Sequence, residues 1–515
     1  MGEFLQIAHS YIRPFKDVSM NFTEPHPLTT LYRELPADLD TPVSVFLRLT
    51  GRGPSFLLES VTGAEQVARY SFIGVDPSEI FVLRGRELEV YQDGKTETLH
   101  ADEGMQPFEL FREVLASYGG KPAHPDLPRF YGGLVGYLGY DSVRFFEPAV
   151  DQPPHPVYPD AMLMHAGTIV AFDHAFDRLL LIASATDKDE ASARLDQLEA
   201  LLSEPIPRPA GAQSVEDFSL QSNMTRSTYT GSVRALQEHI AAGDIFQGVL
   251  SQRLFGTTTA QPFEIYRRLR RLNPSPYMFY FDFGDAATLQ PFRLIGSSPE
   301  MHVRLENGIA SLRPIAGTRP RGATPTEDLA LEAELLDDPK ERAEHLMLID
   351  LARNDLGRVC DYGTVRVPEQ FSVERYSHVM HIVSHTEGRL RKGLDAFDLI
   401  RATFPAGTVT GAPKIRAMQL IRGLEPEPRG PYAGAVGYFS YDGNADTCIA
   451  LRTLVMHGPE FSIQAGAGIV ADSDPDREYE ETLAKARAVA EAVRSAETPE
   501  PFRAAQTIEM GGEPL

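Results

Sequence analysis

The chain has 515 residues and a formal net charge of −23 at pH 7, with 42% hydrophobic and 23% charged residues. This length predicts two to four domains, and this composition is typical of a globular protein rather than a disordered one. The acidic balance argues against a nucleic-acid partner, because phosphate binding needs a basic face. An anionic substrate must therefore be bound by local Arg or Lys side chains, by backbone N–H groups or by a metal ion.

Several classes of protein are excluded by short features. No apolar run approaches the roughly 18 residues of a membrane span, and the first residues lack the basic and apolar regions of a secretory signal. The two cysteines, Cys360 and Cys448, are too few for a disulfide framework or a Cys-based zinc site. We expect both to be buried small hydrophobes in a reducing, cytoplasmic setting.

The first half, residues 27–202, reads as an α+β region. Short alternating strands are expected at residues 80–83 and 87–91, and a helix at residues 191–202. The proline-rich linker that follows, residues 203–224, begins with a stretch that forbids a regular helix or a central strand, so we place the domain boundary there.

The second half, residues 225–495, is predicted to alternate helices and strands, and residues 496–515 form a polar tail that is expected to be flexible. Its first helix begins at Ser227 and ends at Gly243, and a strand at residues 245–254 follows directly.

One segment of the first half is echoed in the second. The eleven residues from Tyr131 match the eleven from Tyr432 at seven positions. The simpler interpretation is two similar glycine-rich strands that permit close backbone approach, and it is slightly favoured. The alternative is that the two halves contain related sheets that pack together.

Two glycine-rich segments resemble nucleotide-binding motifs but depart from them. Residues 466–471 fit the dinucleotide fingerprint, yet no helix opens directly after the glycines. Residues 407–414 have three residues between the glycines instead of four and lack Gly-Lys-Ser/Thr. Nucleotide binding is therefore rejected for both, although their backbone N–H groups remain able to bind an anion.

Two predicted helices begin with paired glutamates. Asp338-Pro339 opens a helix that carries Glu341 and Glu344, and Asp474-Pro475 opens another that carries Glu478 and Glu481. Residues three apart are neighbours on one helical face, so two facing pairs would form an oxygen-lined pocket suited to Mg²⁺. Two solvated acidic helix starts, favoured by the helix dipole, are the plainer interpretation. The repeated spacing shifts the balance modestly toward a metal.

Read together, the segments resemble the large, chorismate-using subunit of anthranilate synthases, from about residue 27 to 493. The segments that carry the resemblance are Leu-Leu-Glu-Ser at 57–60, residues 243–253, Asn-Pro-Ser-Pro-Tyr-Met-Phe-Tyr at 273–280, Gly-Ser-Ser-Pro-Glu at 296–300, residues 314–321, Glu-Arg-Ala-Glu-His at 341–345, residues 377–381, residues 405–414 and residues 464–468. The resemblance implies an α+β chorismate-binding fold: an α/β/β/α sandwich with an N-terminal regulatory domain packed on a catalytic domain.

The resemblance also implies roles for individual residues. Glu344 and Glu481 bind Mg²⁺ directly, Glu341 and Glu478 hold its waters, and the ion grips the ring carboxylate of chorismate. The other carboxylate and the ring are held by Gly317, Thr318, Tyr432, Arg452, Gly466, Ala467, Gly468 and Lys485. Glu300 is the candidate acid for the leaving C4 hydroxyl, and His381 lies close to the reacting ring. Without the resemblance, Glu300 reads as part of a turn and His381 as a core histidine.

Two positions distinguish the reactions of this fold. Relatives that add water carry a lysine base where Gln247 stands, and a neutral amide cannot deprotonate water. Relatives that form aminodeoxychorismate typically have a nucleophilic lysine where Ala316 stands. Both departures favour anthranilate formation from ammonia. The alternatives are an aminodeoxychorismate or isochorismate synthase, or a tryptophan-binding regulatory protein that has lost catalysis.

The resemblance further implies partners and an inhibitor. Neither cysteine lies in a glutaminase setting, so ammonia is expected from a separate glutamine amidotransferase subunit, in a hetero-oligomer, or from solution. Feedback inhibition by L-tryptophan is expected where residues 57–60 meet residues 273–280. The candidate contacts there are Glu59, Ser60, Pro276, Tyr277 and Met278, although each segment alone reads as an ordinary strand or proline turn.

Overall fold

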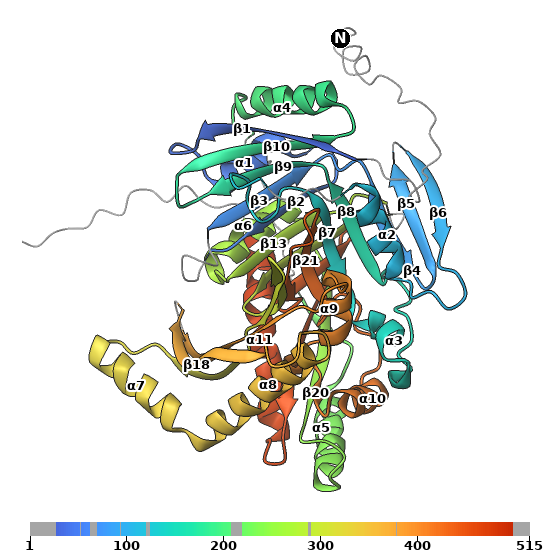
Figure 1. Ribbon diagram of the computed structural model, residues 1–515. Coiled ribbons are helices and arrows are strands. Elements are labelled where there is room, and N and C mark those ends of the chain that lie inside the picture. Colours follow the sequence, from blue (N-terminus) through green and yellow to red (C-terminus); the bar gives the residue numbers. More distant parts are fainter. Residues whose placement is uncertain are drawn as a thin grey trace, which may run out of the picture.

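The computed structural model describes residues 27–51, 53–61, 69–92, 94–119, 124–207, 219–286, 290–376 and 379–497 (Figure 1). Residues 208–218 of the predicted linker, and all but the first two residues of the predicted tail, lie outside the described residues. So do Ser377 and His378 of the segment at 377–381.

The first of two large sheets, sheet A, combines strands from both halves of the chain. Its strands, in spatial order, are β1 (Thr29–Pro36), β10 (Arg178–Ala185), β9 (Thr168–Asp173), β3 (Tyr70–Val75), β2 (Ser55–Glu59), β13 (Tyr277–Asp282), β14 (Phe292–Ser298), β23 (Thr453–His457), β24 (Glu460–Ile469), β12 (Gln247–Thr257) and β11 (Gln221–Ser222), and β20 (Gly411–Ala412) also pairs with β12. β2 joins β13 in an antiparallel ladder where the two halves meet.

Sheet B is assembled in the same way. Its order is β17 (Ile315–Pro320), β19 (Val379–Arg389), β16 (Ile309–Leu312), β15 (Met301–Glu306), β22 (Ala445–Ile449), β21 (Ala435–Ser440), β7 (Gly133–Leu138), β8 (Ala161–Ala166), β4 (Ile80–Arg84), β5 (Glu87–Gln92) and β6 (Lys95–His100), and β18 (Arg366–Arg375) also pairs with β19. Here the halves meet where β21 pairs with β7, again antiparallel.

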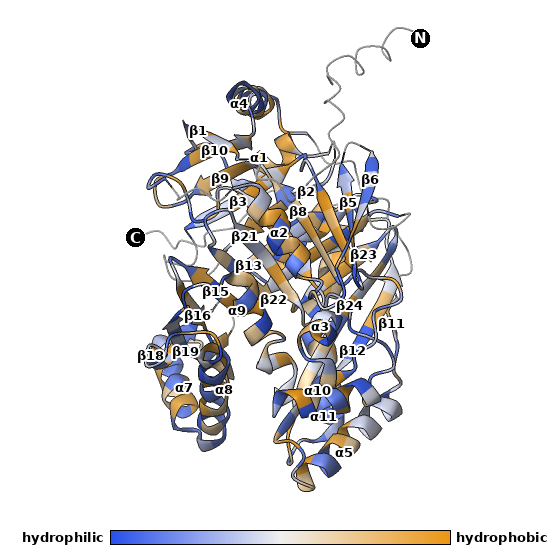
Figure 2. Cartoon of the chain, turned by 45° about the vertical axis from the view of Figure 1, so that its right-hand side comes forward, coloured by the Kyte–Doolittle hydropathy of each residue, from blue (hydrophilic) through white to orange (hydrophobic). Residues whose placement is uncertain are grey.

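The helices lie on the outer faces of the two sheets and in two lobes below them (Figures 1 and 2). They are α1 (Pro42–Leu49), α2 (Glu109–Ser117), α3 (Val143–Phe146), α4 (Lys188–Leu202), α5 (Arg226–Ala241), α6 (Pro262–Leu272), α7 (Pro325–Asp337), α8 (Pro339–Gly357), α9 (Ala396–Thr403), α10 (Lys414–Leu424) and α11 (Pro475–Ala496). No helix in the described ranges is long and apolar enough to cross a membrane.

Alternating side chains along the strands of sheet A build the core. On β2, Phe56 belongs to the cluster between the sheets, whereas Leu57 belongs to the cluster beneath α1, α4, α6 and α11. Phe72 and Ile73 divide in the same way on β3. Successive side chains of a strand point to opposite faces, so sheet A is covered on both sides. The predicted α/β/β/α sandwich is therefore confirmed.

The repeated glycine-rich segments are neighbouring strands. Gly136 of β7 lies opposite Gly437 of β21, and the two strands pair along their whole length. A Cβ atom at Gly437 would lie 2.0 Å from the Asp446 carbonyl oxygen, so the backbone itself fills that space. The favoured interpretation of the repeated sequence, two glycine-rich strands whose backbones approach closely, describes this arrangement. Because the halves share both sheets, their division into a regulatory and a catalytic domain stays a prediction.

Most expected elements appear close to their predicted positions. The strands at 80–83 and 87–91 are β4 and β5, and the helix at 191–202 is the larger part of α4. The strand expected from residue 245 begins at Gln247, and the end of the linker forms β11 against β12. Asp338 and Asp474 cap α8 and α11, where each side chain accepts two backbone N–H bonds.

We predict that Gly437→Ala lowers the free energy of unfolding by about 1–3 kcal/mol, because the added methyl forces β21 away from β22. Urea denaturation measures this. Gly423→Ala is the matched control: that glycine lies in α10, where an added Cβ would have nothing within 4 Å, so alanine should stabilise by up to about 1 kcal/mol. Equal effects of both changes would contradict the close-packing argument.

Candidate active site

The predicted catalytic residues lie where sheet A ends between the two lower lobes. One lobe carries α7, α8, β18 and β19, and the other carries α5, α10 and α11 (Figure 2). The N-terminal turns of α8 and α11 hold the paired glutamates, and β12 and β24 lie between them.

The two glutamate pairs interact with each other. Burial raises the pKa of Glu344, and the charges of Glu341 and Glu481 raise it further. Burial also raises the pKa of Glu478, and Glu481 adds to this effect. Carboxylates on two helices therefore repel each other in a partly desolvated space. A cation between them removes that repulsion, so the donor set fits Mg²⁺.

Neutral and basic groups contact the glutamates and the starts of these helices. The Gln247 Nε2 amide donates to Glu344 Oε1 at 3.4 Å, and Lys485 Nζ lies 2.8 Å from Glu481 Oε1. Lys340 of α8 pairs with Asp472, ahead of α11, at 3.1 Å. No group of three His, Cys, Asp or Glu side chains in the described ranges is already gathered around one metal position. Mg²⁺ keeps several waters and is commonly bound by one or two carboxylates plus substrate oxygens, which suits this arrangement.

His381 on β19 has a defined tautomer. Its Nδ1 lies 2.9 Å from the Gly317 carbonyl oxygen and 3.1 Å from Thr318 Oγ1. A carbonyl oxygen only accepts, so we assign the proton to Nδ1 and the lone pair to Nε2. Burial lowers the pKa of His381, which keeps the ring neutral near pH 7. Gly317 has φ +66°, a left-handed conformation at a bulge between β17 and β19 that favours glycine.

Glu300 follows β14 and is 9% exposed. Burial raises its pKa to about 8, and the nearby Thr408 and Lys485 oppose this only in part. The carboxyl group is therefore protonated at neutral pH and able to donate a proton, as a general acid must. This environment agrees with the role that the resemblance implies.

The glycine segment of β24 offers backbone donors. β23 begins opposite Ile463, so among the described strands residues 464–469 pair with β12 alone. On the edge of β24 that faces away from β12, every second backbone N–H group of these residues is therefore open to a ligand. A Cβ at Gly466 would lie 2.8 Å from the Tyr432 hydroxyl, and one at Gly468 would lie 2.7 Å from Gln247 Nε2. Glycine therefore lets both side chains approach the strand, and Lys485 Nζ donates to the Gly466 carbonyl at 3.0 Å.

Arg452 lies near His381, whose pKa its charge helps to lower. Burial lowers the pKa of Arg452, and no described carboxylate pairs with its guanidinium. Its Nη1 donates only a 3.3 Å bond to Asn273 Oδ1. A partly buried guanidinium without an anion is suited to bind the carboxylate of a ligand.

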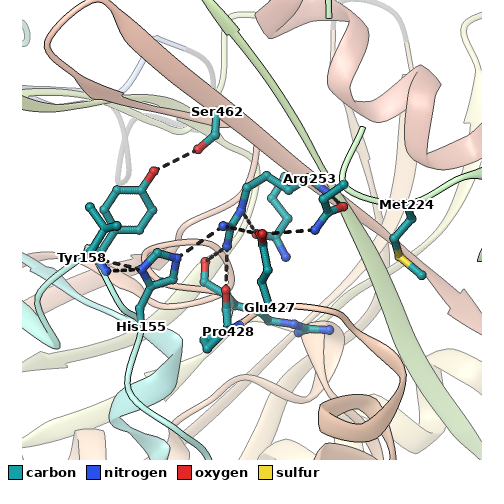
Figure 3. A network of polar contacts seen from close by, with 12 residues as sticks. His155, Tyr158, Met224, Arg253, Glu427, Pro428 and Ser462 are labelled. Atoms are coloured by element: carbon teal, nitrogen blue, oxygen red, sulfur yellow. Dashed lines mark hydrogen bonds and ion pairs between the residues drawn. The ribbon is translucent and has the colours of Figure 1, made fainter. Parts of the chain in front are cut away.

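β12 is anchored to a segment of the first half by Arg253, as Figure 3 shows. Arg253 Nη1 pairs with Glu427 at 2.9 Å, and Nη2 donates to the Pro428 carbonyl at 2.6 Å. His155 lies 3.3 Å away, and burial beside this guanidinium lowers its pKa to about 3. The Nδ1 atom of this neutral ring accepts the backbone N–H of Tyr158 at 3.0 Å. This network fixes the strand that carries Gln247.

The five residues predicted to bind an inhibitor line one cavity at the β2–β13 junction. Its walls also include Tyr70, Phe72, Arg129, Phe279, Tyr438 and Asp446. Met278 lies opposite Glu59 in the ladder, and both side chains face the helix layer. There Arg270 binds the Glu59 carboxylate at 3.0 and 3.1 Å, with the Tyr266 hydroxyl beside it.

Known proteins share this sequence pattern over nearly its whole length. The family model for chorismate binding enzymes matches residues 53–491. Anthranilate synthase component 1 of Acinetobacter calcoaceticus is 47% identical over 475 residues, covering 90% of this chain and 94% of that protein. The chain belongs to the anthranilate synthase component 1 family of chorismate-binding enzymes. The protein of the same name from Aquifex aeolicus is 45% identical and covers 92% of this chain and 96% of its own length.

Solved structures agree with the fold. The crystal structure of anthranilate synthase component I from Streptococcus pneumoniae has a TM-score of 0.73 and 36% identity, covering 88% of this chain and 99% of that one. The menaquinone-specific isochorismate synthase of Escherichia coli has a TM-score of 0.69 at 19% identity, over 92% and 96% of the two chains. The latter likeness concerns the fold alone.

Sequence reasoning missed three polar residues. Asn273 joins the cavity segment to Arg452, whereas Arg129 and Asp446 lie at the cavity wall 3.5 Å apart. Asn273 ends α6 and directly precedes a proline, and this position in the sequence could have identified it as a fixed polar residue at a helix end. Arg129 and Asp446 have no local pattern, because they meet only when β7 pairs with β21.

We predict that Glu300→Gln is more stable than the wild type at pH 9 but similar at pH 4. The native pKa of about 8 exceeds the ordinary value of 4.5, so the native state binds more protons between these values. Wild-type stability therefore falls as pH rises from 4.5 to 8, by up to about 5 kcal/mol. Urea unfolding at both pH values, with exposed Glu460→Gln as control, measures this. If the free energy of unfolding of Glu300→Gln changes with pH as that of the wild type does, Glu300 is not buried in its protonated form.

Proposed function

We propose that this protein converts chorismate and ammonia to anthranilate, pyruvate and water, with Mg²⁺ as its cofactor. The observation that carries the proposal is the neutral Gln247 amide, 3.4 Å from Glu344 at the acidic end of the site. An amide cannot activate water, whereas ammonia needs no base. Ala316, on β17, offers no nucleophile for a covalent route. The relatives named anthranilate synthase component 1 support the same reaction.

The substrate's carboxylates are assigned to opposite ends of the site. Arg452, the Tyr432 hydroxyl and the open N–H groups of residues 466–468 hold the enolpyruvyl carboxylate. Glu344 and Glu481 would bind Mg²⁺ directly, and Glu341 and Glu478 would hold its waters. When bound, the ion neutralises the ring carboxylate and draws electron density from the ring. Lys485 and the Gly317–Thr318 turn complete the substrate's position.

The residues then perform two proton transfers. Ammonia attacks C2, and the C4 hydroxyl leaves as water with the proton of Glu300, which the new ammonium group at C2 then restores. His381 Nε2, with its lone pair directed away from Gly317, accepts the C2 proton as pyruvate is eliminated. Thr318 and the Gly317 carbonyl keep the ring in this tautomer. Aromatisation makes the second step favourable.

The nitrogen comes from a separate subunit. Cys360 and Cys448 are both buried. Burial raises the pKa of the Cys360 thiol to about 11 and that of Cys448 further. A glutaminase nucleophile needs an accessible thiol of low pKa, so neither residue serves. We propose a glutamine amidotransferase partner in a hetero-oligomer, as the designation component 1 of the relatives suggests.

Tryptophan is proposed to inhibit by binding in the β2–β13 cavity. Aromatic walls suit an indole, and Arg129 with Asp446 offers charges for an amino acid's carboxylate and ammonium, beside Ser60. The cavity segment begins at Asn273, which contacts Arg452. A ligand that moves this segment therefore displaces the guanidinium that holds the substrate, which couples the two sites.

The direct test is incubation with chorismate, Mg²⁺ and ammonium chloride, followed by identification of the aromatic product as anthranilate. Glu481→Gln should keep the fold and reduce turnover by about 10- to 100-fold or more, because a direct metal ligand is lost. Glu480→Gln is the neighbouring control, since that side chain pairs with Arg226. If Glu481→Gln keeps full activity with an unchanged Mg²⁺ requirement, the paired glutamates are solvated helix starts and do not bind the metal.

Ser60→Ala should relieve tryptophan inhibition while leaving uninhibited turnover nearly intact. Calorimetric titration with tryptophan should show weaker binding by about tenfold, the value of one lost hydrogen bond to a charged group. Ser203→Ala, after α4, is the control. Absence of binding to the wild type would mean an unregulated synthase, and equal inhibition of wild type and Ser60→Ala would place the inhibitor elsewhere.

A further inference from the structure

A small apolar surface is exposed next to Gln247, and the proposed chemistry does not use it. Phe246 is 72% exposed and Ile415 is 39% exposed. We call these two residues, together with the ion-paired His239, Asp244 and Arg416 near them, the Phe246 surface. Large exposed side chains are common singly, so their position and surroundings decide whether they matter.

The backbone and an ion-pair cluster join these residues. The Phe246 N–H donates to the Ala412 carbonyl at 2.7 Å, three residues before Ile415. Asp244 Oδ2 lies 2.7 Å from His239 Nδ1 and 3.1 Å from Arg416 Nη2. These bonds connect the end of α5, the start of β12 and the first turn of α10. An exposed aromatic side chain on a fixed segment, with charged groups around it, has the composition of a protein interface.

The neighbouring site determines what binds there. Gln247 directly follows Phe246, so the exposed ring lies at the edge of the place where ammonia is consumed. A partner that releases ammonia must dock near this edge, because ammonia that escapes to solvent is diluted and protonated. Of the other exposed apolar residues, Leu39 precedes α1 and Leu329 lies on α7 of the opposite lobe, and neither α1 nor α7 carries a predicted catalytic side chain. Leu346, 47% exposed, lies on α8 of that opposite lobe, two residues after Glu344, so it lies beside a proposed metal ligand, whereas Phe246 lies beside Gln247.

We propose that the Phe246 surface docks the glutamine amidotransferase subunit and places its ammonia outlet at Gln247. This inference rests on the proposed function. Phe246 and Ile415 are the apolar contacts, and Asp244 with its two basic neighbours fixes the orientation through polar contacts at the rim.

The test compares two nitrogen sources in Phe246→Asp and Ile415→Asp. Anthranilate formation is measured with ammonium chloride, and separately with glutamine plus the organism's own amidotransferase subunit. We expect the glutamine-dependent rate to fall by about tenfold or more at limiting partner, as for a central interface residue, while the ammonia-dependent rate stays within about twofold. Phe255→Asp is the matched control, because Phe255 is 39% exposed on the same strand. It lies about 26 Å along β12 from Gln247, and both of its rates should match the wild type.

The outcomes separate the two proposals. If the wild type makes no anthranilate from ammonia, the proposed function fails. If it does, and both surface variants still use glutamine through the partner as the wild type does, the docking proposal is overturned. Where a variant also loses ammonia-dependent activity, calorimetry with the amidotransferase subunit decides: binding weakened by about tenfold supports the surface, and unchanged binding overturns it.

Discussion

The hydrogen-bonded junctions between the two halves of the chain determine the rest of the structure. β2 pairs with β13 in sheet A, and β7 pairs with β21 in sheet B. Register in a ladder is strict where both faces of the sheet are buried, since a slip of one residue turns every side chain to the wrong face. These two ladders therefore place the β2–β13 cavity and Tyr432, which lies just ahead of β21, in fixed positions relative to each other.

The charges around the site explain how an acidic protein can hold an acidic substrate. Glutamates gathered at the starts of α8 and α11 benefit from the helix dipoles, but they repel each other across the lobes. At the other side of the site, Arg452 is desolvated, and no carboxylate in the part of the chain that the structure describes pairs with it. The site is thus electrostatically incomplete at both ends. A dianionic substrate with a divalent cation satisfies both, and a neutral ligand would satisfy neither.

One helix and the residue that ends it connect the β2–β13 cavity to Arg452. In α6, Tyr266 and Arg270 bind the buried carboxylate of Glu59, and the helix ends at Asn273, which contacts Arg452. The middle and the C-terminal end of this helix are therefore held by contacts with the cavity wall and with Arg452, so the two places are joined by a short path of packed residues.

The sequence by itself determined the features that depend on neighbours along the chain. Asp-Pro caps and glutamates three apart fixed the acidic helix starts, and alternating apolar residues identified β4 and β5. The shared motifs also located His381, Glu300 and the glycine segment at 466–468. Only the tertiary structure decided which of these surfaces meet. Arg129 and Asp446 become neighbours through β-pairing across some 300 residues of sequence, and no local pattern encodes such a contact. The glycine echo, likewise, was visible in the sequence, but the pairing of β7 with β21 that joins the halves follows from burial on both faces of sheet B.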